Sequence, residues 1–267
     1  MTYGKLYLIP TPLGDGAPET VLPAPVFSLL PTLHRFVVEE TRTARRFLSS
    51  AGLKGHIGEL EFHELNEHTA PSEVEKFLHL FEDGTSVGLL SEAGLPAVAD
   101  PGALLVALCH RHGIEVVPLV GPSSLMMALM ASGLNGQSFA FVGYIPAKTE
   151  ERRTALKALE KRSAAARQSQ ILIETPYRND SLFADMLQCL SEVVNDPYCD
   201  DIIKELCCIV VLVGRGYVFP AKDICGHLVA PDLHIVLVKT GFKHRQELFR
   251  HAFMHKAGLN GVAHAGS

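Results

Sequence analysis

Short apolar segments alternate with longer amphipathic segments through the first half of this chain, and this alternation most constrains its fold. Residues 6–10, 86–90 and 115–120 are apolar runs of strand length. Residues 74–81 and 104–112 carry apolar side chains at helical spacing. Strands separated by helices of about ten residues are typical of βαβ units, so we predict an α/β fold with a mostly parallel sheet.

The second half has more closely spaced strands and fewer helices, which predicts a mixed α/β domain. A charged, exposed helix is expected over residues 148–168 and a second helix over 182–190. Strands are expected over residues 139–144, 171–173, 208–213 and 234–239. We therefore predict an N-terminal domain of residues 1–119, a C-terminal domain of residues 120–242, and a tail of residues 243–267 that is flexible at its end.

Composition excludes several classes of protein. Of the 267 residues, 47% are apolar, which is enough for a sizeable core. No apolar stretch reaches the roughly 18 residues of a membrane span, and no signal peptide precedes the first strand, so we expect a cytoplasmic protein without a membrane. None of the six cysteines forms a CxxC pair, so no metal site is expected. The net charge of −5 requires any nucleic acid to bind a local basic patch.

Three glycine- and proline-rich segments directly follow predicted strands: residues 10–15, 91–102 and 121–124. The carboxyl ends of parallel strands face the ligand crevice in open α/β sheets. Glycine there lets the backbone approach a ligand closely. None of the segments matches GxGxxG or GxxxxGK[ST], so they predict a small-ligand crevice without specifying a nucleotide.

Five segments, in collinear order, resemble one family. They are Lys-Leu-Tyr-Leu-Ile-Pro-Thr-Pro-Leu-Gly at 5–14, Glu-Glu-Thr-Arg at 39–42, His-Glu-Leu-Asn-Glu at 63–67, the loop at 91–102 followed by Gly-Pro-Ser at 121–123, and Glu-Thr-Pro-Tyr-Arg at 174–178. Together they resemble the tetrapyrrole methylase superfamily, the class III methyltransferases. The nearer match is its branch of 2′-O-ribose methyltransferases for small-subunit ribosomal RNA.

The resemblance implies two α/β domains with S-adenosylmethionine in the cleft between them, usually in a homodimer. By position, the methyl donor would lie against Gly94, Ala97, Val98, Ala99, Ser123, Ser124, Thr175, Pro176 and Tyr177. The acceptor would lie against Pro10, Leu13, Gly14, Arg42, Asn66 and Arg178. Arginines on that side are suited to hold RNA phosphates.

Several positions depart from the pattern of that branch. Glu92 replaces an Asp, Leu65 replaces a His, and Tyr177 stands where His is usual. The resemblance fades beyond residue 190, and residues 207–216 lack the expected Ala-Arg-Glu-Leu-Thr-Lys pattern. These departures indicate a divergent paralogue, in which donor binding is better supported than RNA as the acceptor.

Transfer to a ribose hydroxyl benefits from a proton acceptor, by about 10²–10⁴-fold. The candidates are Glu40, Glu67 and Glu92, with His68 behind them. Each also has a structural alternative: Glu39 and Glu40 pair with the arginines that follow them on a helix surface, and Asn66 closes a turn.

Three functions remain open from the sequence. RNA methylation, with the small ribosomal subunit as partner, is favoured by the motifs and by the arginines after Glu40. Methylation of a tetrapyrrole or another small molecule fits the acidic net charge. A protein that binds the donor without transferring its methyl group fits the lost motif residues.

Overall fold

The computed structural model describes residues 3–14, 16–132, 134–190, 208–213 and 234–238. The chain divides into two compact units, Met1–Met127 and Ala128–Ser267. The domain boundary predicted at residue 119 stays a prediction, and the predicted tail at 243–267 lies outside the described residues.

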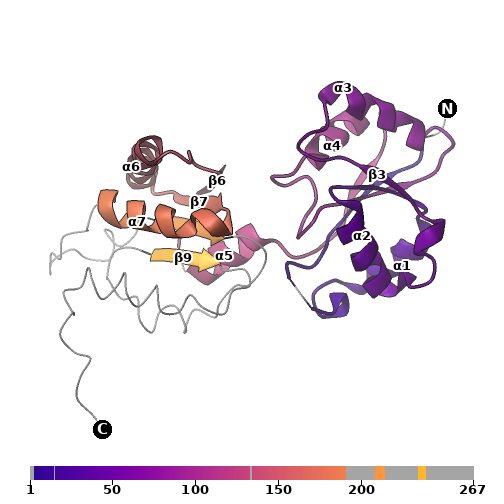
Figure 1. Ribbon diagram of the computed structural model, residues 1–267, viewed down its shortest axis with the longest axis horizontal. Helices are drawn as coiled ribbons and strands as arrows, with labels where there is room; N and C mark the ends of the chain where they lie inside the picture. The colour runs from indigo at the N-terminus through magenta and orange to yellow at the C-terminus, as the bar shows by residue number, and fades with distance from the viewer. Residues whose placement is uncertain (1–2, 15, 133, 191–207, 214–233, 239–267) are drawn as a thin grey trace, which may run out of the picture. The chain divides into compact units, whose positions relative to one another are not determined.

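The first unit is built on a five-stranded sheet in which all neighbouring strands are parallel (Figure 1). The strands lie in the order β3-β2-β4-β1-β5. Their bounds are β1 Leu6–Ile9, β2 Arg35–Val38, β3 Glu61–Glu64, β4 Val87–Leu90 and β5 Val116–Pro118. This sheet confirms the predicted α/β class.

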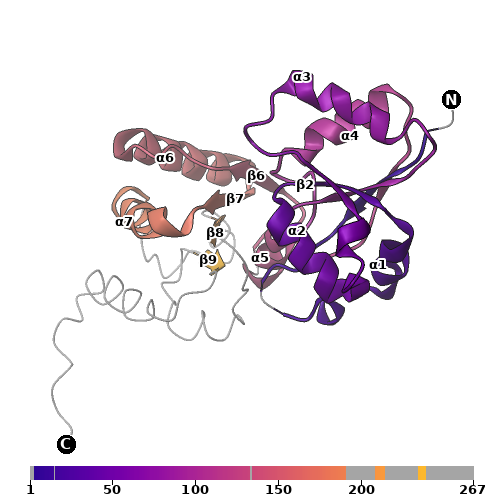
Figure 2. The same cartoon turned by 45° about the vertical axis from the view of Figure 1, so that its right-hand side comes forward.

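Helices cover both faces of this sheet, α1 and α2 on one side and α3 and α4 on the other (Figures 1 and 2). Their bounds are α1 Ala24–Leu29, α2 Thr41–Leu48, α3 Pro71–Val74 and α4 Gly102–Arg111. Strand β2 shows why both faces need cover: Phe36 and Val38 pack with one cluster and Val37 with the other. Alternating side chains that are apolar on both faces are typical of buried parallel strands.

Short helical turns join these elements. The 3₁₀ turns are Pro18–Thr20, Leu30–Thr32, Ile57–Glu59 and Glu75–Leu80, and a π-helical turn covers Ser49–Leu53. The helix predicted over residues 74–81 is therefore divided in the structure, with α3 ending at Val74 and a 3₁₀ segment following it.

The second unit holds a four-stranded sheet, also parallel, in the order β6-β7-β8-β9. Its strands are β6 Phe139–Gly143, β7 Ser169–Glu174, β8 Cys208–Val213 and β9 His234–Val238. Helix α5, Ser124–Ser132, begins in the first unit and ends in the second; the helices wholly within the second unit are α6 Thr149–Ala166 and α7 Asn179–Cys189, with a 3₁₀ turn at Pro176–Arg178.

Helices α6 and α7 are joined by a buried ion network as well as by apolar packing. Leu156, Leu172 and Met186 belong to one core cluster. Beside it, the carboxylate of Asp185 accepts hydrogen bonds from Arg152 Nε at 2.7 Å and Arg153 Nε at 2.8 Å. Asp185 is only 3% exposed and Arg152 only 4%. Because water does not reach them, each charge depends on the other for its stabilisation.

Candidate functional site

The loops that follow β1 and β4 are tied to each other by their backbones. Thr11 N–H donates to the Gly94 carbonyl at 2.9 Å, and Gly94 N–H donates to the Thr11 carbonyl at 3.1 Å. The Thr11 hydroxyl, which is buried, also donates to the Ser91 carbonyl at 3.5 Å. Because β1 and β4 are parallel neighbours, both loops leave the same edge of the sheet.

The loop after β5 meets the other two at two glycines. A Cβ built on Gly94 would lie 3.0 Å from Leu13 Cδ2 and 3.4 Å from the Pro122 carbonyl oxygen. A Cβ built on Gly121 would overlap the ring of Pro10. The structure therefore brings together the three segments that the sequence singled out, and it does so where glycine removes a side chain.

The loop after β4 holds an unusual backbone conformation. Gly94 has φ +81°, and Ala97 and Ala99 have φ of 65° and 59°, a region that costs about 1–3 kcal/mol for a residue with a Cβ. Asp100 offsets this strain, since its Oδ1 accepts hydrogen bonds from Ala97 N–H at 2.9 Å and Gly102 N–H at 2.8 Å. Strain that is held in place by neighbours is typical of ligand-binding loops.

Asp100 has a second feature that bears on a ligand. Its Oδ2 is buried and has no hydrogen-bond partner within the described part of the chain. Burial raises the pKa of this carboxyl group above its ordinary value, against two backbone hydrogen bonds that lower it. Asp100 is not among the site residues that the sequence predicts, although it lies in the loop at 91–102 on which the resemblance rests.

Glu39 connects the end of β2 to the same loop. Its Oε2 accepts a hydrogen bond from Glu92 N–H at 3.2 Å. Glu39 therefore cannot be explained by pairing with the arginines of α2 alone, because its side chain contacts the loop of the candidate site. Glu92 itself is half-buried at the head of the loop.

Glu40 and Glu64 together satisfy the first N–H groups of α2. Glu40, the N-cap, accepts from Arg42 N–H at 2.9 Å and Thr43 N–H at 2.6 Å. Glu64 accepts from the Thr41 N–H at 3.1 Å and the Thr41 hydroxyl at 2.6 Å. Hydrogen bonds led by the Thr43 hydroxyl hold the pKa of Glu40 below its ordinary value. A carboxylate so stabilised is a weak proton acceptor.

The remaining candidates of the first unit follow β3 or begin α5. The side chains of Glu67 and His68 are each 85% exposed, and Glu67 Oε1 lies 3.6 Å from His68 Nε2. Asn66 Oδ1 accepts from His68 N–H at 3.0 Å, so Asn66 closes a turn. Strand β3 is separated from β1 by two strands, roughly 14 Å from axis to axis. Ser123 accepts from Met126 N–H at 3.4 Å, which makes it a cap of α5, and Ser124 begins that helix.

In the second unit, the Glu-Thr-Pro-Tyr-Arg segment is organised by its first residue. The buried Glu174 carboxylate accepts from Thr175 N–H at 2.7 Å and from Arg178 Nε at 2.8 Å. Tyr177 is 80% exposed beside this pair. The charge of Arg178 is thus already paired within its own unit. The assignments of Thr175, Pro176, Tyr177 and Arg178 to donor or acceptor stay predictions.

Comparison with known proteins gives one consistent set of sequence relatives. The chain is 33% identical over 189 residues to a protein of Escherichia coli O157:H7 named "Ribosomal RNA small subunit methyltransferase I". A protein of the same name from Thermotoga maritima is 32% identical over 189 residues, which are 71% of this chain and 79% of that protein. The chain belongs to the ribosomal RNA small subunit methyltransferase I family. No family model matches it.

Coverage of the family members is uneven. The match spans 62% of the Escherichia coli protein and 61% of one from Neisseria meningitidis serogroup B, both less than two thirds of the relative's length. Among solved structures, a uroporphyrin-III C-methyltransferase from Thermus thermophilus gives a TM-score of 0.36 at 25% identity, covering 52% of this chain and 60% of that chain. A conserved hypothetical protein of Aeropyrum pernix K1 gives 0.48 at 16% identity, covering 70% and 66%.

The described residues of this family member include neither a candidate metal-binding cluster nor a membrane-spanning helix. They contain no group of three or more His, Cys, Asp or Glu side chains placed to hold a metal ion. The helices among them include none that is long and apolar enough to cross a membrane.

Proposed function

We propose that this chain transfers a methyl group from S-adenosylmethionine to a ribose 2′-hydroxyl of small-subunit ribosomal RNA. The observation that carries the proposal is the meeting of three loops at Thr11, Gly94 and Gly121, in a chain whose relatives are named as ribosomal RNA methyltransferases. The acceptor follows from those names and from the branch that the motifs resemble.

The residues of the first unit fit the methyl donor. Gly94 leaves the backbone bare, Val98 and Ala99 are exposed on the same loop, and the unpartnered Asp100 Oδ2 can accept a hydrogen bond. We assign the donor to Gly94, Ala97, Val98, Ala99, Ser123 and Ser124 and, on the resemblance alone, to Thr175, Pro176 and Tyr177. The acceptor is assigned to Pro10, Leu13, Gly14, Arg42, Asn66 and Arg178.

S-adenosylmethionine, when bound, supplies an electrophilic methyl group on its sulfonium sulfur. The protein's part is then to orient the donor and the acceptor hydroxyl, which is worth roughly 7–11 kcal/mol in well-oriented reactions. Thr11 and Gly94 exchange backbone hydrogen bonds, so the assigned acceptor and donor loops are held together.

Among the three candidate carboxylates, Glu92 is the best placed to accept the hydroxyl proton. It is half-buried on the loop that carries Gly94. Glu40 is occupied as the cap of α2, and Glu67 is 85% exposed after the edge strand β3. We therefore assign the proton acceptor to Glu92 and a capping role to Glu40.

The setting follows from the proposed substrate. A ribosomal RNA acceptor implies the small ribosomal subunit or its RNA as partner and a cytoplasmic location. A homodimer, which the resemblance implies, is part of the same proposal and is testable by light scattering.

The test is methyl transfer to small ribosomal subunits purified from a strain that lacks this gene, followed by alkaline hydrolysis of the RNA. A ribose 2′-O-methyl group blocks cleavage at its own nucleotide, so the label is expected in an alkali-stable dinucleotide. Label in mononucleotides would place the methyl group on a base and reject the ribose assignment. No label in the RNA, with donor binding intact, would reject RNA as the acceptor.

A further inference from the structure

The solvent face of α2 carries three arginines in one row. Arg42, Arg45 and Arg46 stand at positions i, i+3 and i+4, which share one side of a helix, and all three are exposed. The opposite side of the helix, with Phe47 and Leu48, is buried in the core of the first unit. Within the described residues, none of the three guanidinium groups forms an ion pair with a carboxylate.

Acidic side chains precede this row, at Glu39 and Glu40, but none follows it closely in the sequence. Residues 41–58 contain Arg42, Arg45, Arg46 and Lys54 and no Asp or Glu, in a protein of net charge −5. The carboxylates of Glu40 and Glu64 accept backbone hydrogen bonds from α2 itself. Beyond Glu40, whose charge is felt by Arg42, the exposed side of α2 is therefore a run of positive charge on an acidic protein.

Helix α6, the other basic segment, differs in this respect. Its basic side chains stand among acidic ones: Lys148, just before the helix, pairs with Glu151 at 3.2 Å, Arg153 pairs with Asp185 of α7 at 2.8 Å, and Glu160 lies between Lys157 and Lys161 in the sequence. A surface on which charges of both signs are interspersed attracts a polyanion more weakly than a run of one sign. The contrast favours α2 over α6 as the place where an anionic partner binds.

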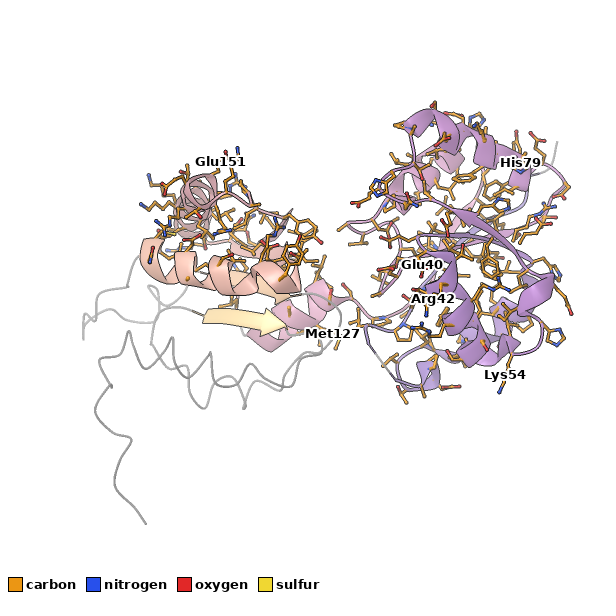
Figure 3. The ribbon with its side chains drawn as sticks, in the orientation of Figure 1. Glu40, Arg42, Lys54, His79, Met127 and Glu151 are labelled. Atoms are coloured by element: carbon orange, nitrogen blue, oxygen red, sulfur yellow. The ribbon has the colours of Figure 1, made fainter. Side chains whose placement is uncertain are left out.

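Position in the fold connects the row with the candidate site. Helix α2 begins directly after β2, which pairs with β4, so its first turn lies at the sheet edge from which the loop of Gly94 also leaves. Figure 3 shows Glu40 and Arg42 at the beginning of α2 and Lys54 beyond its end. The helix extends about 12 Å away from that edge.

We infer that the arginine row of α2, formed by Arg42, Arg45 and Arg46, binds the sugar–phosphate backbone of the RNA whose nucleotide enters the candidate site. The inference rests on the proposed function for its choice of RNA. A guanidinium group can donate two parallel hydrogen bonds to one phosphate. Three guanidinium groups along a helix therefore match a chain of several phosphates better than they match one isolated phosphate. Contacts of this kind position the RNA without reading its sequence.

The experiment measures binding of a single-stranded oligoribonucleotide of mixed sequence at several salt concentrations, with S-adenosylhomocysteine present. The row variant replaces Arg42, Arg45 and Arg46 by Gln, which keeps helix propensity. The matched control replaces Lys157, Lys161 and Arg162, exposed on α6, by Gln. The slope of log K against log salt is negative, and loss of three phosphate contacts reduces its magnitude by about 2 for single strands.

The row variant is expected to lose that slope while the α6 control keeps it. An unchanged slope in the row variant, or an equal loss in the control, overturns the inference. Arg45 also lies over the Phe62 ring, so a variant with only Arg42 and Arg46 replaced is measured if the triple variant is unstable. Its slope is expected to fall by about 1.4.

Two further arms separate the sources of failure. Vesicles of phosphatidylcholine and phosphatidylserine test a membrane surface: retention of the protein on vesicles that depends on the row, with RNA binding unaffected, overturns the inference.

Methylation of small subunits is followed in the same variants. Methylation by the wild type with an unchanged slope in the row variant rejects the row alone. Loss of slope without any wild-type methylation supports the row as an RNA surface and rejects the proposed function.

Discussion

Thr11 and Gly94 exchange both of their backbone hydrogen bonds, at 2.9 and 3.1 Å, although they lie on different loops and far apart in the sequence. This pairing fixes the loop assigned to the acceptor against the loop assigned to the donor. A methyl transfer depends on the relative position of two reactants, so a rigid connection between the two loops is the structural feature on which the proposed function most depends.

Replacement of Glu92 by Gln tests the proton acceptor. We expect the rate of methyl transfer to small ribosomal subunits to fall about 10²–10⁴-fold, because the amide cannot take the hydroxyl proton. Calorimetric affinity for S-adenosylhomocysteine should be unchanged. The matched control is Glu67→Gln, on an exposed side chain after β3, which should retain its rate. Equal rates for Glu92→Gln and the wild type would remove Glu92 from the mechanism.

Replacement of Glu39 by Ala tests the connection between β2 and the donor loop. The variant loses the hydrogen bond to Glu92 N–H, and we expect roughly tenfold weaker binding of S-adenosylhomocysteine, equivalent to about 1.4 kcal/mol. Glu39→Gln keeps an acceptor oxygen and should restore most of the affinity. A conservative variant that is as weak as Glu39→Ala would show that the negative charge, rather than the hydrogen bond, is what matters.

Replacement of Glu40 by Gln tests its capping role through pH. The pKa of Glu40 is lowered in the folded protein, so its contribution to stability is fully present above the unfolded value, 4.5, and is lost as pH falls through the folded pKa. The wild type should therefore exceed Glu40→Gln in unfolding free energy at neutral pH. This difference should shrink on acidification, as followed by denaturant unfolding. A difference that does not change with pH would contradict the role.

Replacement of Asp185 by Ala tests the ion network between α6 and α7. It leaves the buried guanidinium of Arg152 without a carboxylate, and removal of one partner from a buried pair destabilises by about 3–5 kcal/mol. Chemical denaturation of the second unit should show this loss. Asp83→Ala is the comparison, because Asp83 is 54% exposed in its ion pair with Arg35 and should contribute much less to stability.

Hydrophobic patterning predicted the apolar strands of both sheets and missed one strand at a sheet edge. Strand β4, with four buried residues, and the apolar β8 were both evident from composition. Strand β3 was not, since its sequence Glu-Phe-His-Glu contains one apolar residue and it lies at the edge of the sheet. Edge strands need less apolar surface, so their pattern carries less information.

The loops of the candidate site were predicted from glycine, proline and their position after strands, whereas the bonds that connect them were not. Nothing local in the sequence indicates that Glu39 reaches Glu92, or that Asp100 holds Ala97 in the left-handed region. These contacts depend on the strand order β2-β4-β1, in which the neighbours are not consecutive in the chain. Sequence periodicity specifies elements but not that order.

The most direct test of the donor site is calorimetric binding of S-adenosylhomocysteine to Gly94→Ala, with Gly113→Ala as the matched control. Both glycines have positive φ, so both variants carry similar backbone strain. Only at Gly94 would the new methyl group press on Leu13 and Pro122, because nothing lies within 4 Å of it at Gly113. We expect binding to fall at least tenfold in Gly94→Ala and to be retained in Gly113→Ala, roughly a 1.4 kcal/mol difference. Equal affinity in the two folded variants would contradict the assignment of the methyl donor to these loops.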